Sequence, residues 1–290
     1  MTTFEVLATG PLATVQDAGR AGLAHLGVGP SGAADRTSLG QVNRLLGNAE
    51  GAAAVEVTLG GLHLRANGSA DVAVVGAPAQ VHLGRRAIGS GTPFRVEAGD
   101  ELTLAAPSRG LRSYLGVRGG ITTDPVLGSR SSDLLAGVGP GPLRPGDVLP
   151  VGADVGPWPG VDVLTWLTDP AEHRRLRAVA GPRREWFSDA ALDDLAGGPW
   201  RVSGDANRTA VVLDGPAIIR SHDGELPPEG MVRGAIQVPP SGRPTILLAD
   251  HPVTGGYPVL AVLLAEDVDW LAQLRPGDPV LLQPVVAPVL

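Results

Sequence analysis

The sequence predicts a mainly β protein of the α+β type, with two β-barrel subdomains and a few short helices. Glycine (41) and proline (27) are abundant among its 290 residues, which favours many short elements joined by turns over long helices. Hydrophobic residues make up 43% of the chain, enough for a substantial core. Short apolar segments separated by Gly/Pro turns recur in both halves, as in β-barrels and sandwiches.

The first half is predicted to open with a strand at residues 4–8, followed by a turn-rich segment of polar side chains. The spacing of apolar residues predicts a helix at residues 33–46. Ser31 is the expected N-cap and Gly47 the expected stop, as these residue types favour the two ends of helices.

Residues 54–59 alternate between apolar and polar side chains, which predicts a half-buried strand with Glu56 and Thr58 on its polar face. Further strands are expected wherever short apolar runs lie between turns. In the first half these are residues 71–75, 80–83, 94–96, 101–104 and 111–117.

A Gly- and Pro-rich stretch at residues 152–160 is the expected connection, which divides the chain into domains 1–160 and 161–290. The second domain is again mostly β, with a helix at 189–195 capped by Ser188 and another at 268–274. Residues 169–178 fit either a strand or a short helix. The expected strands are residues 200–202, 210–213, 234–238, 245–249, 259–264 and 280–284.

A Gly-Asp pair recurs at residues 99–100, 146–147 and 277–278, each time just before a predicted strand. A common hairpin turn explains this recurrence as well as an internal duplication does, and both explanations stay open.

Composition excludes several functions. The net charge is −7 and the chain has no basic run, so we expect neither a nucleic-acid nor a membrane partner. No stretch approaches the ~20 apolar residues of a membrane span, and the N-terminus does not resemble a signal peptide. With no cysteine in the chain, we expect a cytoplasmic protein.

Lysine is absent as well. The chain therefore has no Schiff-base lysine, no phosphate loop of the Gly-x-x-x-x-Gly-Lys type and no attachment site for covalent biotin. The six histidines are scattered without a metal-binding spacing, so no metal site is predicted. Arginine remains available for binding carboxylates and phosphates in a two-pronged geometry.

Polar side chains concentrate on Gly/Pro turns near the N-terminus. The boxes are Thr-Val-Gln-Asp-x-Gly-Arg at residues 14–20, Pro-x-Gly-Ala-x-Asp-Arg at 30–36, Asn-x-Leu-x-Gly-Asn at 43–48 and Glu-x-Thr-x-Gly-Gly at 56–61. Binding groups often lie on such loops when rigid elements hold them. An ordered surface loop with paired charges is the alternative.

A second box, at residues 248–258, leads from an apolar strand through an acid and a Gly-Gly turn into another apolar strand. Backbone N–H groups at Thr254, Gly255 and Gly256 are candidates for an oxyanion-binding nest. Asp250 is a candidate to orient or deprotonate an amide. The alternative is a hairpin whose aspartate caps its own turn.

Three further boxes support these two. Residues 115–121 carry Arg118, residues 127–131 carry Arg130, and residues 230–242 carry Gln237 on an otherwise apolar strand.

Together these boxes resemble the allophanate hydrolase subunit 2 family, also called the biotin-dependent carboxyltransferase-like family. The resemblance covers nearly the whole chain. It departs from the family pattern at residues 205–213, where Arg208 is kept but a neighbouring acid and a second arginine are replaced. The family implies cyclophilin-like β-barrel subdomains and a partner of the allophanate hydrolase subunit 1 family, resembling the B subunit of 5-oxoprolinase.

The resemblance implies that this chain is the C subunit of a bacterial-type ATP-dependent 5-oxoprolinase, which opens 5-oxo-L-proline to L-glutamate and is active only with its partners. The amidohydrolase-like A subunit is a further expected partner, and ATP is expected to act through the complex. One alternative is a biotin-dependent carboxyltransferase component that acts on urea or a related amide, with carboxybiotin on a separate carrier. Another is a non-catalytic regulator that binds a kinase-inhibitor homologue.

The resemblance also assigns the site residues. The expected proton-handling residues are Asp17, Asp35 and Asp250. The expected substrate- or anion-binding residues are Gln16, Arg20, Ser31, Arg36, Glu56, Arg118, Arg130, Arg208, Gln237, Thr254, Gly255, Gly256 and Tyr257. We expect acids and arginines from the two ends of the chain to meet at a shared polar hollow.

Overall fold

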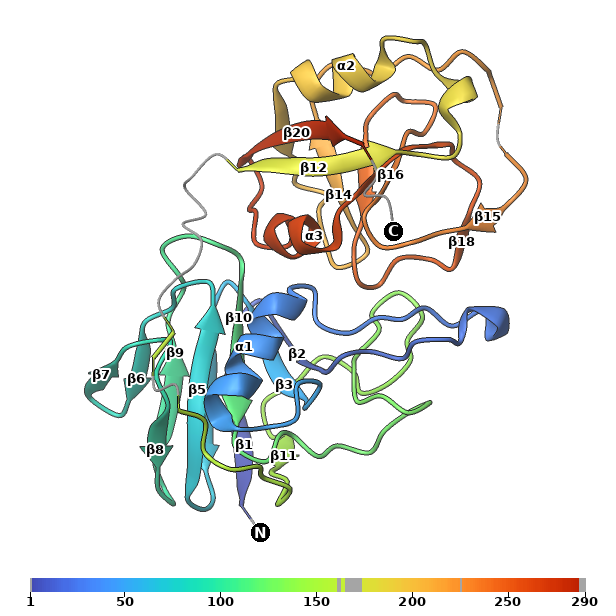
Figure 1. Ribbon diagram of the computed structural model, residues 1–290. Coiled ribbons are helices and arrows are strands. Elements are labelled where there is room, and N and C mark those ends of the chain that lie inside the picture. Colours follow the sequence, from blue (N-terminus) through green and yellow to red (C-terminus); the bar gives the residue numbers. More distant parts are fainter. Residues whose placement is uncertain (1, 161–162, 165–173, 225, 287–290) are drawn as a thin grey trace. The chain divides into compact units, whose positions relative to one another are not determined.

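The computed structural model describes residues 2–160, 163–164, 174–224 and 226–286 (Figure 1). The chain divides into two compact units, Met1–Ala21 with Ser31–Asp169 and Gly22–Pro30 with Pro170–Leu290. The boundary expected between residues 160 and 161 follows the linear chain, whereas the contacts assign residues 22–30 to the second unit. The described part is mostly β with three α-helices, which confirms the predicted fold class.

The first unit contains two sheets of antiparallel strands. One has the order β11-β1-β4-β9-β6-β7 and the other the order β2-β3-β10-β5-β8. Their bounds are β1 Thr3–Thr9, β2 Leu12–Gln16, β3 Ala54–Thr58, β4 Leu62–Ala66, β5 Ala70–Gly76, β6 Val81–Leu83, β7 Arg86–Ile88, β8 Phe94–Val96, β9 Glu101–Leu104, β10 Arg112–Val117 and β11 Val148–Pro150.

Strand β5 shows how the two-residue period of a strand builds this unit. Val72 and Val74 belong to the main core, which draws side chains from both sheets. Ala73 and Val75 point to the other face and pack with the apolar side of α1 (Arg36–Leu46). Figure 1 shows α1 lying across the β5–β10 region. The second sheet is therefore covered on both faces, which explains its nearly continuous apolar sequence.

Helix α1 begins three residues later than predicted, at Arg36. Its N-cap is Asp35, not Ser31, because the Asp35 carboxylate accepts the N–H of Ser38 at 2.9 Å. The preceding N–H groups of Ala33 and Ala34 are bound outside the helix, by Asp17 O at 3.0 Å and Glu56 Oε2 at 2.9 Å. The expected stop at Gly47 is confirmed, with φ +63°.

Two predictions for the neighbouring strands were wrong. Residues 12–16 belong to strand β2, which pairs with β3 along its length, although their box suggested a loop. The polar face of β3 does not face solvent, since Glu56 is 1% exposed. Alternation alone cannot distinguish a solvated face from one covered by a helix and a loop.

The second unit is a closed barrel with the order β12-β19-β16-β17-β14-β13-β20. The parallel pair of β12 and β20 joins antiparallel neighbours, and the enclosed side chains form a separate core. The bounds are β12 Arg175–Ala180, β13 Trp200–Val202, β14 Ala210–Asp214, β16 Ala235–Gln237, β17 Thr245–Leu247, β19 Val259–Leu263, β20 Pro279–Val285, α2 Ala191–Gly197 and α3 Ala265–Leu271, with a separate ribbon of β15 Glu229–Gly230 and β18 Thr254–Gly255.

Both predicted helices of this unit are shifted. Helix α2 starts at Ala191 after Ala190, and no side chain caps it, so the predicted cap at Ser188 was wrong. Helix α3 spans Ala265–Leu271 rather than residues 268–274. Of the ambiguous segment 169–178, the part from Arg175 is strand, while residues 169–173 lie outside the described residues. No helix in the described part of the chain is both long and apolar enough to span a bilayer.

The three Gly-Asp turns share one geometry. In each turn the aspartate carboxylate accepts the N–H three residues earlier, at 2.8 Å for Asp100, Asp147 and Asp278. The preceding glycines have φ of +90°, +94° and +89°. Each turn leads directly into a strand, which confirms the prediction. Two local requirements are sufficient to explain the recurrence. The aspartate caps the turn, and the preceding positive φ favours glycine.

Candidate functional site

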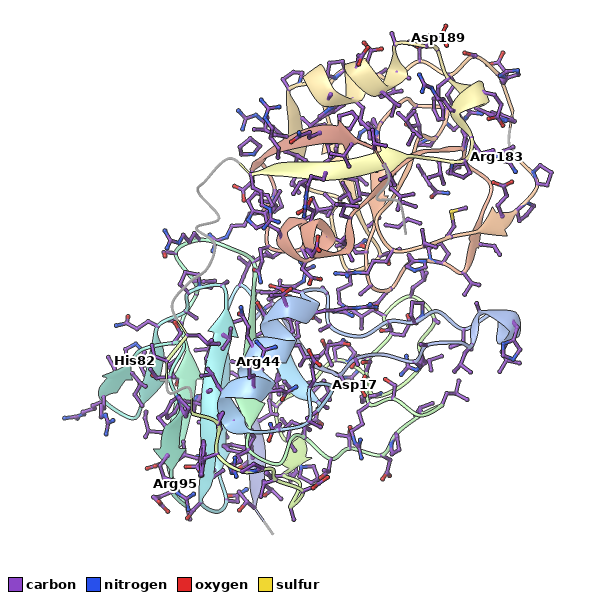
Figure 2. The ribbon with its side chains drawn as sticks, in the orientation of Figure 1. Asp17, Arg44, His82, Arg95, Arg183 and Asp189 are labelled. Atoms are coloured by element: carbon purple, nitrogen blue, oxygen red, sulfur yellow. The ribbon has the colours of Figure 1, made fainter. Side chains whose placement is uncertain are left out.

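Asp17 lies just beyond the end of β2 and holds a loop distant in sequence. Its Oδ1 accepts the hydroxyls of Ser129 at 2.6 Å and Ser131 at 2.5 Å, and the N–H of Gly19 at 2.8 Å. Its Oδ2 accepts the N–H of Arg130 at 2.6 Å. Asp17 is 8% exposed and in Figure 2 lies on the side of the first unit away from His82 and Arg95. Its carboxylate is therefore surrounded by neutral donors.

Gln16 and Ser31 bind the same loop one residue further on. The Gln16 side-chain Nε2 donates to Ser132 O and to Thr14 Oγ1, both at 3.0 Å. The Ser31 hydroxyl donates to the same carbonyl at 3.0 Å. Ser31 has φ +49°, an unusual value for a residue with a Cβ, and is fully buried.

Arg20 fastens the other side of the loop. Its Nη2 donates to Ser131 O at 2.5 Å, and its Nε donates to Val126 O at 3.4 Å. A Cβ at residue 139 would lie 3.0 Å from Arg20 Nη2 and 2.1 Å from Ser131 O, so only glycine fits beside this guanidinium. Arg20 is 3% exposed, which is rare for a charged side chain that donates to carbonyl oxygens in place of a carboxylate.

Three buried atoms in this group have no hydrogen-bond partner in the described part of the chain: Gln16 Oε1, Arg20 Nη1 and Ser132 Oγ. Each unpaired buried polar atom costs about 1–3 kcal/mol of folding free energy. All three belong to residues that contact or form the loop at residues 129–132, which makes this group the candidate binding site of the unit. We name this group the Ser131–Ser132 cluster; it consists of Gln16, Asp17, Arg20, Ser31 and residues 129–132.

Asp35 and Glu56 form a neighbouring layer that positions the loop before α1. The Tyr114 hydroxyl donates to Glu56 Oε2 at 2.7 Å and accepts the N–H of Asp35 at 2.8 Å. Burial raises the pKa of Tyr114 well above its usual value, and the charges of Glu56 and Asp35 raise that pKa further. Arg112 lies 3.6 Å from Glu56. Asp35 and Glu56 therefore accept hydrogen bonds from backbone N–H groups and are not exposed to solvent.

The other arginines predicted in this unit lie in different surroundings. Arg118 donates to Leu46 O and Gly156 O, both at 2.5 Å, and its guanidinium lies 4.1 Å from the ring centroid of Trp158. Arg130 takes part in the cluster through its backbone N–H, while its Nε donates to Thr123 O at 2.8 Å. Arg36 is exposed at the first turn of α1.

In the second unit, Arg208 and Asp250 form a two-pronged ion pair. Arg208 Nε lies 2.9 Å from Asp250 Oδ2, and Arg208 Nη2 lies 2.9 Å from Asp250 Oδ1. The two side chains are 2% and 0% exposed. The N–H of Asp250 also donates to Arg208 O at 3.0 Å, which fixes the two backbones against each other.

The predicted oxyanion nest beside Asp250 is not formed. Thr254 and Gly255 are extended and pair with Glu229 and Gly230, and Gly255 and Gly256 lack the positive φ that a nest needs. Gln237 instead lies over this ribbon. Its Nε2 donates to Tyr257 O at 3.3 Å, and a Cβ at residue 255 would lie 2.8 Å from Gln237 Nε2.

Sequence reasoning missed the serines 129, 131 and 132 and the hydroxyl of Tyr114. The Leu-Gly-Ser-Arg-Ser box at residues 127–131 contains Ser129 and Ser131, but the prediction selected only its arginine as a binding residue. The predicted site residues that the structure brings together therefore form two groups, one in each unit, while Arg36 and Arg118 lie outside both. Among the described residues, no group of three or more His, Asp or Glu side chains is arranged to hold a metal ion.

Comparisons with known proteins agree with this architecture. Residues 26–284 match the family model of the carboxyltransferase domain, subdomain A and B. The chain is 37% identical over 283 residues to the C subunit of 5-oxoprolinase from Escherichia coli, which covers 96% of this chain and 89% of that protein. It is also 31% identical to urea amidolyase of Lachancea kluyveri, covering 97% of this chain but 17% of that protein.

Solved structures show the same fold. The Kluyveromyces lactis urea carboxylase superposes with a TM-score of 0.89 at 30% identity, covering 98% of this chain and 27% of the solved one. The protein TTHA0988 superposes with a TM-score of 0.88 at 36% identity, and this chain spans 55% of its length. By sequence and by structure, the chain belongs to the family of the carboxyltransferase domain, subdomain A and B.

Proposed function

We propose that the chain is the C subunit of an ATP-dependent 5-oxoprolinase, opening 5-oxo-L-proline to L-glutamate together with partner subunits. The observation that carries this proposal is the match to the Escherichia coli C subunit of that name, which extends over 89% of that protein. The matches to urea amidolyase instead correspond to a small part of a much longer chain. We also propose that this complex acts in the cytoplasm.

The Ser131–Ser132 cluster is the part of this chain that we propose to contact the substrate. Opening a lactam requires activation of its carbonyl, and a guanidinium donor stabilises negative charge that develops on that oxygen. Arg20 Nη1 is such a donor. Asp17 and Asp35 position the surrounding loops, since their oxygens already accept hydroxyl or backbone donors. We assign ATP binding to the assembled complex and not to a group of residues in this chain.

The partners we propose are a protein of the allophanate hydrolase subunit 1 family, resembling the B subunit of 5-oxoprolinase, and an amidohydrolase-like A subunit. The test is reconstitution of this chain with both partners, followed by measurement of ATP-dependent glutamate release from 5-oxo-L-proline. Release that requires all three proteins and ATP is expected. A complex that assembles but forms no glutamate would exclude this function.

A carboxyltransferase component is the second candidate, favoured by the structural match to urea carboxylase over 98% of this chain. It predicts ATP-independent carboxylation of urea or a related amide by carboxybiotin on a separate carrier protein. Because the chain has no lysine, biotin cannot be attached to it covalently. Transfer of labelled carboxylate from carboxybiotin to urea, without glutamate formation in the first assay, would favour this candidate.

A further inference from the structure

The loop at residues 124–139 exposes large apolar side chains at two turns. The first turn carries Val126 and Leu127, which are 40% and 50% exposed. The second carries Leu134 and Leu135, which are 39% and 53% exposed. In Figure 1 this loop is a green segment that extends beyond the strands of the first unit. Single exposed apolar residues are common on protein surfaces, but several on one loop indicate an interaction surface. We name these four side chains the apolar tips.

Leu127 has an unfavourable backbone conformation. Its φ is +52°, and that of Gly128 is +81°. Val126 and Ser129 exchange backbone hydrogen bonds at 2.8 and 3.2 Å, so residues 127–128 are the centre of a two-residue hairpin turn. A turn with positive φ at both central residues is of type I′, which prefers Asn-Gly. A leucine there costs folding free energy, and burial within the chain does not offset this cost because the side chain is half exposed.

The second turn is closed by Asp133. Its N–H donates to Val138 O at 2.9 Å, and its Oδ1 accepts the N–H of Leu135 at 3.0 Å and that of Ala136 at 2.9 Å. The polar groups of this turn are therefore bound within the turn, while its two leucine side chains remain accessible.

Hydrogen bonds to β2 fix the loop between and after the two turns. The N–H of Ser132 donates to Val15 O at 3.0 Å, and the N–H of Leu143 donates to Ala13 O at 2.9 Å. The side chain of Leu143 belongs to the core of the first unit. Together with the Ser131–Ser132 cluster, these contacts hold the apolar tips in place before a partner binds. Such ordering in advance lowers the entropic cost of association.

We propose that the apolar tips are the docking surface for the B-like partner subunit, which receives Leu127 and Leu135 in an apolar pocket. This inference rests on the proposed function, which supplies that partner. Residues 125–128 and 134–143 contain no charged side chain. The matching surface of the partner is therefore apolar and uncharged, as at the centre of protein–protein interfaces, where charged residues are depleted.

The lengths of the relatives favour a protein partner in direct contact with this domain. The match spans 89% of the Escherichia coli C subunit but 55% of TTHA0988. The same fold therefore occurs as a separate chain and also joined to a comparable length of further polypeptide. A segment joined to this fold in one chain corresponds to a separate partner where the fold stands alone, and the two share a surface. A second copy of this chain is the alternative occupant.

Leu127→Asn is the decisive variant. It supplies the Asn-Gly pair that the turn prefers, so the thermal stability of the chain should be unchanged or higher. Binding to the B-like subunit should be more than about 10-fold weaker, as when an interface hot spot is removed. Leu135→Ser, at the second turn, is expected to weaken binding about 3- to 10-fold. Titration calorimetry measures the affinities and thermal denaturation the stability, so weak binding by a stable variant is not an effect of unfolding.

Val148→Thr is the matched control. Val148 is 54% exposed in β11 of the same unit, as accessible as Leu127, but it lies outside the loop. This variant should bind the B-like subunit as tightly as the unmodified chain does. Unchanged affinity in both tip variants, an equal loss in Val148→Thr, or no binding of the B-like subunit to the unmodified chain would each overturn the proposal.

Analytical ultracentrifugation of the chain alone tests the alternative occupant. A dimer that both tip variants dissociate, with unchanged affinity for the B-like subunit, would assign the surface to a second copy and overturn the proposal. Failure of this inference is distinguishable from failure of the function. Glutamate release together with normal assembly of the tip variants would retain the oxoprolinase and reject the docking surface. Assembly that depends on the tips but yields no glutamate would do the reverse.

Discussion

Asp17 and Asp250 are both buried carboxylates that the sequence singled out, but different kinds of hydrogen-bond donor stabilise them. In the first unit, Asp17 is held by two serine hydroxyls and two backbone N–H groups, all of them neutral. In the second, Asp250 faces the two-pronged guanidinium of Arg208. No atom of that pair is among the unpaired buried atoms of the described residues, whereas the first group leaves three. A group with unused atoms can accept a ligand, while a completed ion pair mainly fixes the fold.

The largest expected effect is at the ion pair. Arg208→Met leaves the Asp250 carboxylate buried without its cation, and we expect a loss of about 3–5 kcal/mol in the free energy of unfolding. Urea denaturation measures it. The double variant Arg208→Met with Asp250→Leu removes both charges and should recover most of this loss. A single variant that costs less than about 1 kcal/mol would show that the pair does not fix the barrel.

Asp17→Asn tests the contrasting group. The new amide keeps one acceptor oxygen but turns an N–H donor toward the N–H of Arg130, so we expect a loss of about 2–3 kcal/mol. Hydrogen exchange should accelerate at residues 129–132, because Asp17 holds them in place. Unchanged exchange there would mean that the loop is held by other contacts and that the comparison with Asp250 fails.

Asp267 is a second ion-paired aspartate, and its shifted pKa makes its contribution to stability dependent on pH. Its oxygens accept Arg177 Nε at 2.8 Å and Arg174 Nη2 at 2.7 Å. Burial raises the pKa of Asp267, but the hydrogen bonds from Arg177 and the charge of Arg174 outweigh it, and the net pKa is lowered. A lowered folded-state pKa stabilises the protein above the unfolded value of about 3.9, and this contribution is lost as the pH falls through the folded-state pKa.

The matching variant is Asp267→Asn. Its stability at pH 7 should be about 2 kcal/mol lower than that of the unmodified protein, discounted because Arg174 and Arg177 are partly exposed. The difference should shrink as the pH falls below about 4, where the carboxylate is neutralised in the unfolded chain. Thermal denaturation at several pH values measures it, and a difference independent of pH would contradict an ionic role.

The smallest expected effect is at Tyr114. Tyr114→Phe removes the donor to Glu56 and the acceptor for the N–H of Asp35, at an expected cost of about 1–2 kcal/mol. Since the folded-state pKa of Tyr114 is raised, this contribution is present below the unfolded value of about 10 and is lost as the pH rises beyond it. The free energy of unfolding of the unmodified protein and of Tyr114→Phe is compared by denaturation at pH 7 and pH 11. An equal cost of the substitution at both pH values would contradict a role for the neutral hydroxyl.

Several elements of the fold were predictable because their causes are local. The turns at Asp100, Asp147 and Asp278 are set by a carboxylate that caps an N–H three residues away. The stop of α1 at Gly47 follows from a left-handed residue. The start of α1 was not predictable, because two long-range partners, Asp17 O and Glu56, draw residues 33–34 out of the helix.

The candidate site was predictable in its residues but not in their roles. Gln16, Asp17 and Arg20 stood out as polar side chains in one box, yet their partners lie more than 100 residues further along the chain. Ser132 carries no charge and has no motif of its own, so only its position against Gln16 reveals it. The convergence of both ends of the chain on one hollow stays a prediction, since the two groups lie in separate units.

Residue types and local spacing alone determined the class of fold, many of its short strands, the absence of lysine chemistry and the family to which the chain belongs. Tertiary structure decided which polar side chains have all their polar atoms hydrogen-bonded and which keep an unpaired atom. That distinction depends on long-range partners: Asp17 and Asp250 are both acids in conspicuous boxes, but serines and backbone surround one and an arginine neutralises the other. Hydrogen-bond satisfaction is a property of three-dimensional neighbours, and a sequence motif does not contain it.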